Sequence, residues 1–221
     1  MIQAALFDMD GVLFNTEVLG FQTMKQLSAE KGYAIDQAFY ETTLGVPNAE
    51  CGGIYRKALG EAFPYEEVIA RFRDFFLDYV RTRPLPFKPG LVDCLSGLRK
   101  RGVKIALATS TVRQLVTKYF AVMPEIGAYF DGIVCGGEVP NGKPAPDIYI
   151  AAARSVGCAP DNCIGVEDSF SGVQAIHAAG AHCVMIPDLL PYQPKFAPYV
   201  DHCLSSLNDL CPLVDRLNEV K

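Results

Sequence analysis

The sequence predicts an α/β fold: a parallel sheet with helices on both faces, into which an all-helical domain is inserted after the first strand. Two observations predict it. After residue 90, short apolar runs alternate with helical patterns, as expected for right-handed βαβ units. Before residue 83, one apolar run at residues 2–7 is followed only by helical periodicity. We therefore assign residues 1–15 and 84–221 to the sheet domain and residues 16–83 to the helical domain.

Composition limits the classes of protein that the chain can represent. With 221 residues, half of them apolar, it can bury a substantial core. The net charge of −5 and the dispersed basic residues argue against nucleic-acid binding. No apolar run approaches the length of a membrane span, and the first residues lack the pattern of an export signal. We expect a cytoplasmic protein that binds neither nucleic acid nor membrane.

Eight cysteines are scattered through apolar stretches, without a C-x-x-C pair or a nearby histidine cluster. This distribution predicts reduced core residues rather than metal ligands or disulfides. They are Cys51, Cys94, Cys135, Cys158, Cys163, Cys183, Cys203 and Cys211.

The apolar run at residues 2–7 is short, lacks helical spacing and ends in Asp8, Met9, Asp10 and Gly11. It predicts a buried strand with polar residues at its carboxyl end. Two aspartates at i and i+2 on an extended chain point to the same side, and two such carboxylates repel unless a cation lies between them. Mg²⁺ suits such a site. The alternative is that Asp10 and Gly11 only form a turn.

The inserted domain shows four helical patterns. The first has apolar residues spaced by three up to Leu27, with Thr16 as a candidate N-cap and Gly32 as its stop. Two more cover residues 36–44 and 48–59. The fourth, residues 65–79, carries aromatic residues at i, i+3, i+4 and i+7, which we expect to pack as core between the helices.

Residues 83–90 contain three prolines and predict a hinge or linker. Beyond it we expect helices at residues 91–101, 112–120, 147–156 and 171–179, and strands at residues 103–108, 133–135, 163–166 and 183–186.

Ligands of open parallel sheets bind outside the carboxyl ends of the strands, so polar residues at those ends are candidates for the site. Thr109, Ser110 and Thr111 follow strand 103–108, where a hydroxyl and backbone N–H groups can hold a phosphate. The same residues can also cap the next helix. Glu167 and Asp168 follow strand 163–166; the alternative for them is a favourable interaction with a helix N-terminus.

Lys143 ends a stretch, residues 137–143, that formally matches the first part of a phosphate-binding P-loop. We reject that match, because Pro144 stands where the loop needs Ser or Thr and because prolines lack the N–H groups that the loop must donate. Lys143 can still balance the acids and a phosphate as a point charge. The alternative is an ordinary surface lysine.

Four motifs occur in order: D-x-D-G at residues 8–11, Thr or Ser after the second strand, G-K-P-x-P-D at residues 142–147 and E-D-S-x-x-G at residues 167–172. Together they resemble the motifs of the haloacid dehalogenase superfamily, with its Rossmann-like core. The helical insertion resembles the smaller-cap subclass that includes β-phosphoglucomutase and many sugar-phosphate phosphatases. The resemblance implies a Mg²⁺-dependent phosphatase of a small phosphorylated metabolite, acting through an aspartyl-phosphate.

The resemblance also implies roles for single residues. Asp8 corresponds to the nucleophile, and Asp10 to the general acid and base, whose backbone carbonyl also contacts Mg²⁺. Thr109 and Lys143 correspond to the phosphate-holding residues, with Ser110 beside them. Asp168 corresponds to a Mg²⁺ ligand, with Glu167 adjacent as a further candidate ligand.

Two positions depart from the β-phosphoglucomutase pattern. Gly20 stands where those enzymes carry a histidine on the first cap helix, and Asn48, still a candidate substrate contact, stands where they carry a phosphate-binding arginine. Both missing groups serve the mutase step, so the resemblance favours a phosphatase, with a phosphomutase as the first alternative and a non-catalytic phospholigand-binding protein as the second. Asn15 also replaces an acid common in the motif D-x-D-G-x-x-x-D-[ST], near the hinge. We expect a monomer or weak dimer.

Overall fold

The computed structural model describes residues 1–44, 46 and 48–219. The chain forms two compact units, Met1–Asn15 with Pro84–Lys221 and Thr16–Arg83. We call them the sheet unit and the helical unit. None of the helices in the described part of the chain has the length and apolarity needed to cross a membrane.

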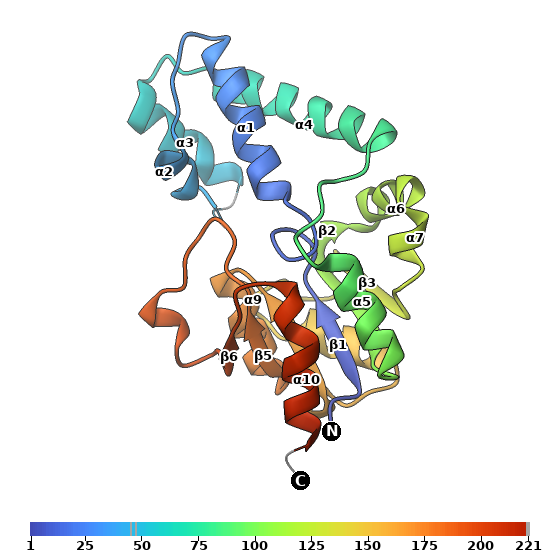
Figure 1. Ribbon diagram of the computed structural model, residues 1–221. Coiled ribbons are helices and arrows are strands. Elements are labelled where there is room, and N and C mark those ends of the chain that lie inside the picture. Colours follow the sequence, from blue (N-terminus) through green and yellow to red (C-terminus); the bar gives the residue numbers. More distant parts are fainter. Residues whose placement is uncertain (45, 47, 220–221) are drawn as a thin grey trace. The chain divides into compact units, whose positions relative to one another are not determined.

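The sheet unit contains a six-stranded sheet in the order β3-β2-β1-β4-β5-β6, and every neighbouring pair is parallel (Figure 1). The first strand lies near the centre of the sheet. This confirms the predicted fold class. The strands are β1 (Ala4–Phe7), β2 (Lys104–Val112), β3 (Gly132–Gly136), β4 (Cys163–Glu167), β5 (His182–Met185) and β6 (His202–Cys203).

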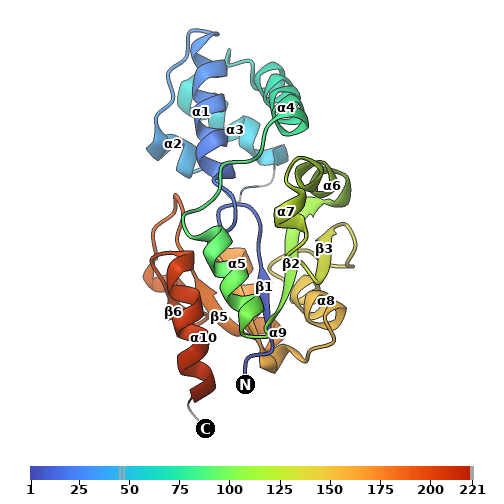
Figure 2. The ribbon, with the colours of Figure 1, turned by 45° about the vertical axis from the view of Figure 1, so that its right-hand side comes forward.

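Helices cover both faces of this sheet: α8 and α9 lie on one face, and α5 and α10 on the other (Figure 2). All four residues of β1 are buried, and two of them, Ala4 and Leu6, belong to the core cluster that includes α8 and α9. Burial on both faces explains the uninterrupted apolar run. The helices of this unit are α5 (Leu91–Lys100), α6 (Arg113–Val122), α7 (Pro124–Gly127), α8 (Asp147–Ser155), α9 (Phe170–Ala179) and α10 (Leu210–Glu219).

The helical unit consists of α1 (Thr16–Ala29), α2 (Gln37–Glu41), α3 (Asn48–Leu59) and α4 (Tyr65–Thr82). The second helix is shorter than predicted and begins after Asp36, whose carboxylate accepts the Phe39 N–H at 2.8 Å. Thr16 is the first residue of α1 rather than its N-cap, and its buried hydroxyl has no hydrogen-bond partner among the described residues.

The aromatic face of α4 is less buried than predicted. Only Tyr65, Val68 and Val80 of this helix are buried, and Phe75 remains 39% exposed. Its ring packs instead against neighbouring rings of the same helix. The prediction of core packing is therefore wrong for this part of α4, because aromatic periodicity alone does not show that a partner covers the whole face.

The cysteines are all reduced. Six of the eight are buried, Cys158 is half-buried, and Cys203 is exposed in the short strand β6, against the prediction of a core residue.

The chain segments that join the two units are paired inside the sheet unit. The Asn15 backbone N–H donates to the Pro86 carbonyl at 2.7 Å, and its side-chain amide donates to the Phe87 carbonyl at 3.0 Å. Lys88 N–H donates to the Leu13 carbonyl at 2.9 Å. An ionised aspartate side chain has no donor. Asparagine at position 15 therefore adds a side-chain hydrogen bond between the segment that leads into the helical unit and the segment that leads out of it.

Candidate active site

The carboxyl ends of β1, β2 and β4 meet at one edge of the sheet. Phe7 pairs with Leu107 of β2 and with Val166 of β4. Asp8, the next residue, donates its backbone N–H to the Val166 carbonyl at 3.0 Å. This register brings Asp8 level with Glu167, and it places Thr109 just beyond the paired part of β2.

The turn after β1 depends on Gly11. Its φ of +78° lies in the left-handed region, which favours glycine. A Cβ at this position would also lie 2.2 Å from a carboxylate oxygen of Asp168. Glycine therefore lets the chain turn sharply and lets the Asp168 carboxylate approach the backbone of the D-x-D-G motif.

Lys143 is a buried cation between two acids. Its Nζ lies 2.5 Å from Asp8 Oδ1 and 2.6 Å from Glu167 Oε1, and its side chain is only 6% exposed. The Nζ also lies 5.1 Å from the centre of the Tyr149 ring. Although burial acts to lower it, the charges of Asp8 and Glu167 raise the pKa of Lys143 above its usual value. Lys143 is therefore not a surface lysine.

Glu167 is held by five donors. Its Oε1 accepts from Lys143 and from the Tyr149 hydroxyl at 3.1 Å. Its Oε2 accepts the N–H groups of Asp168 and Ser169 and the Ser169 hydroxyl, at 2.9–3.0 Å. Burial opposes ionisation, but Lys143 and these hydrogen bonds lower the pKa of Glu167. These donors fix the position of the carboxylate, and the fixed carboxylate in turn orients Lys143.

Position 172 must be glycine for this arrangement. A Cβ on Gly172, in the first turn of α9, would lie 1.8 Å from the carboxyl carbon of Glu167. The Glu167 carboxylate therefore occupies the space beside the start of this helix, which Ser169 caps through its hydroxyl.

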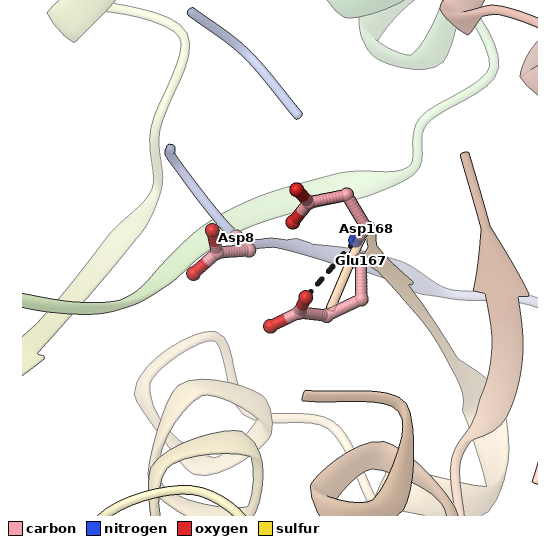
Figure 3. Close-up of side chains that lie close together, drawn as sticks. All are labelled: Asp8, Glu167 and Asp168. Carbon is pink, nitrogen blue, oxygen red and sulfur yellow. Dashed lines mark hydrogen bonds between the residues drawn. The ribbon is translucent and has the colours of Figure 1, made fainter. Parts of the chain in front are cut away.

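The carboxylates of Asp8, Glu167 and Asp168 come from the ends of two neighbouring strands, and one oxygen from each lies within 4.8 Å of the others (Figure 3). Burial, together with the charges of Glu167 and Asp10, raises the pKa of Asp8 to about 8 against the opposing effect of Lys143. Three neighbouring acids, with one lysine between two of them, leave negative charge that a cation can balance. Carboxylate oxygens are the ligands that Mg²⁺ prefers, and the group formed by Asp8, Glu167 and Asp168 could hold such an ion.

Asp10 is held from β2. The Thr111 hydroxyl donates to Asp10 Oδ2 at 2.8 Å, and the Thr111 N–H donates to the Thr109 hydroxyl at 3.0 Å. Thr109 is buried, whereas Ser110 is exposed. Since β2 continues to Val112 after a register shift, these residues do not cap α6, and that part of the prediction is wrong.

The structure therefore brings Asp8, Asp10, Lys143, Glu167 and Asp168 together, with Thr109 linked to Asp10 through one further residue. The predicted substrate contact of Asn48 falls on a side chain that the structure does not describe.

Sequence reasoning missed Tyr149 and did not foresee the contact of Thr111 with Asp10. Thr111 lies two positions after Thr109 on extended chain, so alternation could have indicated that both face the same side. Tyr149 gave no signal, because a tyrosine on the apolar face of a helix is ordinary core.

Comparison with known proteins gives consistent matches. The family model described as haloacid dehalogenase-like hydrolase matches residues 2–180. The phosphorylated carbohydrates phosphatase of Thermotoga maritima is 32% identical over 179 residues, 81% of this chain and 82% of that protein. The crystal structure of a putative β-phosphoglucomutase from the same organism has a TM-score of 0.79 and 27% identity, with all of both chains covered.

A longer protein also matches. SUPPRESSOR OF QUENCHING 1, a chloroplastic protein of Arabidopsis thaliana, is 31% identical over 191 residues, which are 86% of this chain but only 18% of that protein.

Proposed function

Because the chain belongs to the haloacid dehalogenase-like hydrolases, we propose that it is a Mg²⁺-dependent phosphatase that hydrolyses a small phosphorylated metabolite, a sugar phosphate or similar compound. The observation that carries the proposal is the pair of aspartates at the end of β1, with Lys143 Nζ 2.5 Å from Asp8 and the Thr111 hydroxyl 2.8 Å from Asp10. One carboxylate is thus set beside a cation, and the other is held separately for proton transfer. The named activity of the Thermotoga phosphatase agrees with this.

Asp8 is the proposed nucleophile. One of its oxygens attacks phosphorus and the bond from phosphorus to the leaving oxygen breaks, which gives an aspartyl-phosphate and splits one slow displacement into two steps. Lys143 neutralises charge on the phosphoryl oxygens, and the Thr109 hydroxyl and the Ser110 N–H hold them. Phosphoryl transfer depends mostly on such positioning and charge neutralisation. Bound Mg²⁺ would add further neutralisation, held by Asp8, Asp168 and the Asp10 carbonyl.

Asp10 is the proposed general acid and base. It gives its proton to the leaving alcohol oxygen in the first step and then takes a proton from the water that attacks the aspartyl-phosphate. The Thr111 hydroxyl fixes one oxygen of this carboxylate, so that the proton is exchanged at a defined position. In this proposal the helical unit serves as the cap.

A phosphomutase is the second candidate, since one matched structure is described as a putative β-phosphoglucomutase. A mutase must protect its phosphoenzyme from water and hold a second phosphate. Gly20 has no side chain for the first task, and asparagine at position 48 lacks the charged bidentate group that arginine offers for the second. We therefore favour the phosphatase.

We expect the protein to release inorganic phosphate from sugar monophosphates and to isomerise none of them. The measurement is a panel of phosphorylated metabolites with Mg²⁺, assayed for free phosphate. One arm contains β-glucose 1-phosphate with a trace of β-glucose 1,6-bisphosphate, assayed also for glucose 6-phosphate. Glucose 6-phosphate formed faster than phosphate would establish the mutase instead, and no turnover of any compound would contradict both.

We expect activity to require Mg²⁺, to disappear in excess chelator and to be inhibited by Ca²⁺. Ca²⁺ accepts more ligands at longer distances than Mg²⁺, so it can bind both oxygens of Asp8 and leave none to attack. A binding measurement separates the metal site from catalysis: Mg²⁺ should raise the melting temperature of the wild type but not of Asp168→Asn. Full activity in excess chelator would rule out the metal role.

A further inference from the structure

Helices α5 and α10 lie side by side in the sheet unit and run in the same direction (Figures 1 and 2). Gly97 of α5 faces Cys211 of α10, since a Cβ at residue 97 would lie 2.7 Å from the Cys211 sulfur. One turn further along, the Arg101 guanidinium donates to both carboxylate oxygens of Asp215, at 2.7 and 2.6 Å. These contacts fix the position of Cys211 against α5.

Two thiols meet where these helices touch. Cys94 lies one turn before Gly97 on α5, and its thiol hydrogen-bonds the Cys211 sulfur. The Cys211 thiol in turn donates to the Cys94 carbonyl oxygen at 3.6 Å. Because the two cysteines are 117 positions apart in the sequence, it is the fold that brings them together, and glycine at position 97 leaves the space for the second sulfur.

Cys211 is the more reactive member of this pair. The hydrogen bond from Cys94 and the charge of Arg101 lower the pKa of Cys211, although burial and Asp215 act against them. The same hydrogen bond, together with burial, raises the pKa of Cys94. Cys211 is also 9% exposed, whereas Cys94 is 2% exposed. Since the thiolate is the nucleophile, Cys211 is suited to react first and Cys94 to follow.

Another close pair of thiols, Cys158 and Cys163, has different surroundings. Burial, the neighbouring Cys158 and the charge of Asp161 all raise the pKa of Cys163. This pair therefore has an acid where Cys211 has Arg101. Oxidation should begin at Cys211 rather than at Cys163.

We propose that Cys94 and Cys211 form a redox-sensitive pair, which hydrogen peroxide or another hydroperoxide converts into a reversible disulfide between α5 and α10. The inference is independent of the proposed function, because neither cysteine belongs to the candidate active site.

The reaction takes place in two steps. The Cys211 thiolate attacks one oxygen of hydrogen peroxide and the O–O bond breaks, which leaves a sulfenic acid on Cys211 and, after the departing oxygen takes a proton, one water. The Cys94 sulfur then attacks the Cys211 sulfur and the S–O bond breaks, and the oxygen leaves as a second water with the proton of Cys94. The two thiols lose two electrons in all, and a dithiol returns them by exchange.

The disulfide would fasten the C-terminal helix α10 to the helix that follows the linker. It would close a long loop and so restrict mainly the unfolded chain. We therefore expect oxidation to raise the melting temperature by about 5–10 °C, and reduction to reverse the rise.

The test identifies which cysteines become linked. The whole chain is treated with hydrogen peroxide at neutral pH and high dilution, the remaining thiols are blocked with N-ethylmaleimide, and its peptides are analysed by mass spectrometry with and without dithiothreitol. The wild type is compared with Cys94→Ala, Cys211→Ala and the control Cys203→Ala, which removes an exposed thiol. Circular dichroism establishes that each variant is folded.

We expect a peptide link between residues 94 and 211 in the wild type and in Cys203→Ala, and none in the other two variants. In Cys94→Ala the sulfenic acid on Cys211 should persist and react with dimedone. In Cys211→Ala, Cys94 should carry no such label. The rise in melting temperature should occur only in the two proteins that form the link.

Links between other cysteines would overturn the inference, as would a Cys211 that oxidises to a sulfinic acid while Cys94 keeps its thiol. A wild type that stays unlinked after its Cys203 thiol has been fully oxidised would do the same. If Cys211→Ala does not fold, the wild type and Cys94→Ala still decide between these outcomes. None of them bears on the phosphatase.

Discussion

Asp8→Asn should reduce phosphate release by about 10³-fold or more, as expected when the residue that forms the covalent bond is removed. The amide is nearly isosteric with the carboxylate, but its oxygen is a far weaker nucleophile. The fold should persist, because the asparagine oxygen can still accept the Lys143 ammonium that now lies 2.5 Å from Asp8. Rapid quenching of a reaction with labelled acetyl phosphate should trap label on the wild type and none on Asp8→Asn.

Two further variants test whether the loss is specific to the nucleophile. Asp10→Asn should still accept label from acetyl phosphate, whose leaving group needs little protonation. Asp161→Asn makes the same chemical change at an exposed residue just before β4 and should leave activity unaltered. Asp8→Asn with the activity of the wild type would show that another group attacks phosphorus.

The sheet could be predicted from the sequence because its strands are buried on both faces. Such strands appear as short apolar runs, and β1, β4 and β5 lie within one or two residues of their predicted bounds. The strand that was predicted least well is β2, which continues to Val112 through a register shift. Thr109 and Thr111 are polar, and polar residues conventionally indicate the end of a buried strand rather than its continuation.

The helices α7 and α10 and the two-residue strand β6 were not predicted, and neither were the short 3-10 helices Pro160–Asn162, Pro194–Phe196 and Leu207–Asp209. β6 contains only His202 and Cys203 and pairs with β5 alone, so no periodicity can reveal it. The last helix does have an apolar face, which includes Leu210, Leu213 and Val214, so the sequence carries a helical pattern there.

The acids and the lysine of the site were predicted because the motifs place charged residues directly after apolar strands. What the sequence could not show is how each charge is satisfied. Glu167 stays a candidate metal ligand, as a member of the acidic group with Asp8 and Asp168, and the structure shows that five donors already hold it, two of them backbone N–H groups. Likewise Gly20 indicated only a missing histidine, because the Tyr40 hydroxyl that occupies its space comes from a helix 20 residues further along.

Lys143→Met should destabilise the protein and nearly abolish its activity. The methionine fills most of the same volume but leaves Asp8 and Glu167 facing each other without a cation, in a site where the lysine side chain is only 6% exposed. Removing one partner of a buried ion pair costs about 3–5 kcal/mol. The urea concentration at the midpoint of unfolding should therefore be lower for Lys143→Met than for the wild type. The control Lys100→Met, at an exposed residue of α5, should lower that midpoint very little.

The double variant Lys143→Met with Glu167→Gln separates the structural from the catalytic part of this loss. The glutamine oxygen can accept the N–H groups of Asp168 and Ser169, and the glutamine is uncharged, so the repulsion between residue 167 and Asp8 is gone. We expect the midpoint to recover by about half, since a buried polar group that keeps its hydrogen bonds costs far less than a buried charge. Activity should not recover, because no cation then faces the phosphoryl group. A double variant that regains activity together with stability would show that Lys143 only holds the two acids in place and does not act on the phosphate.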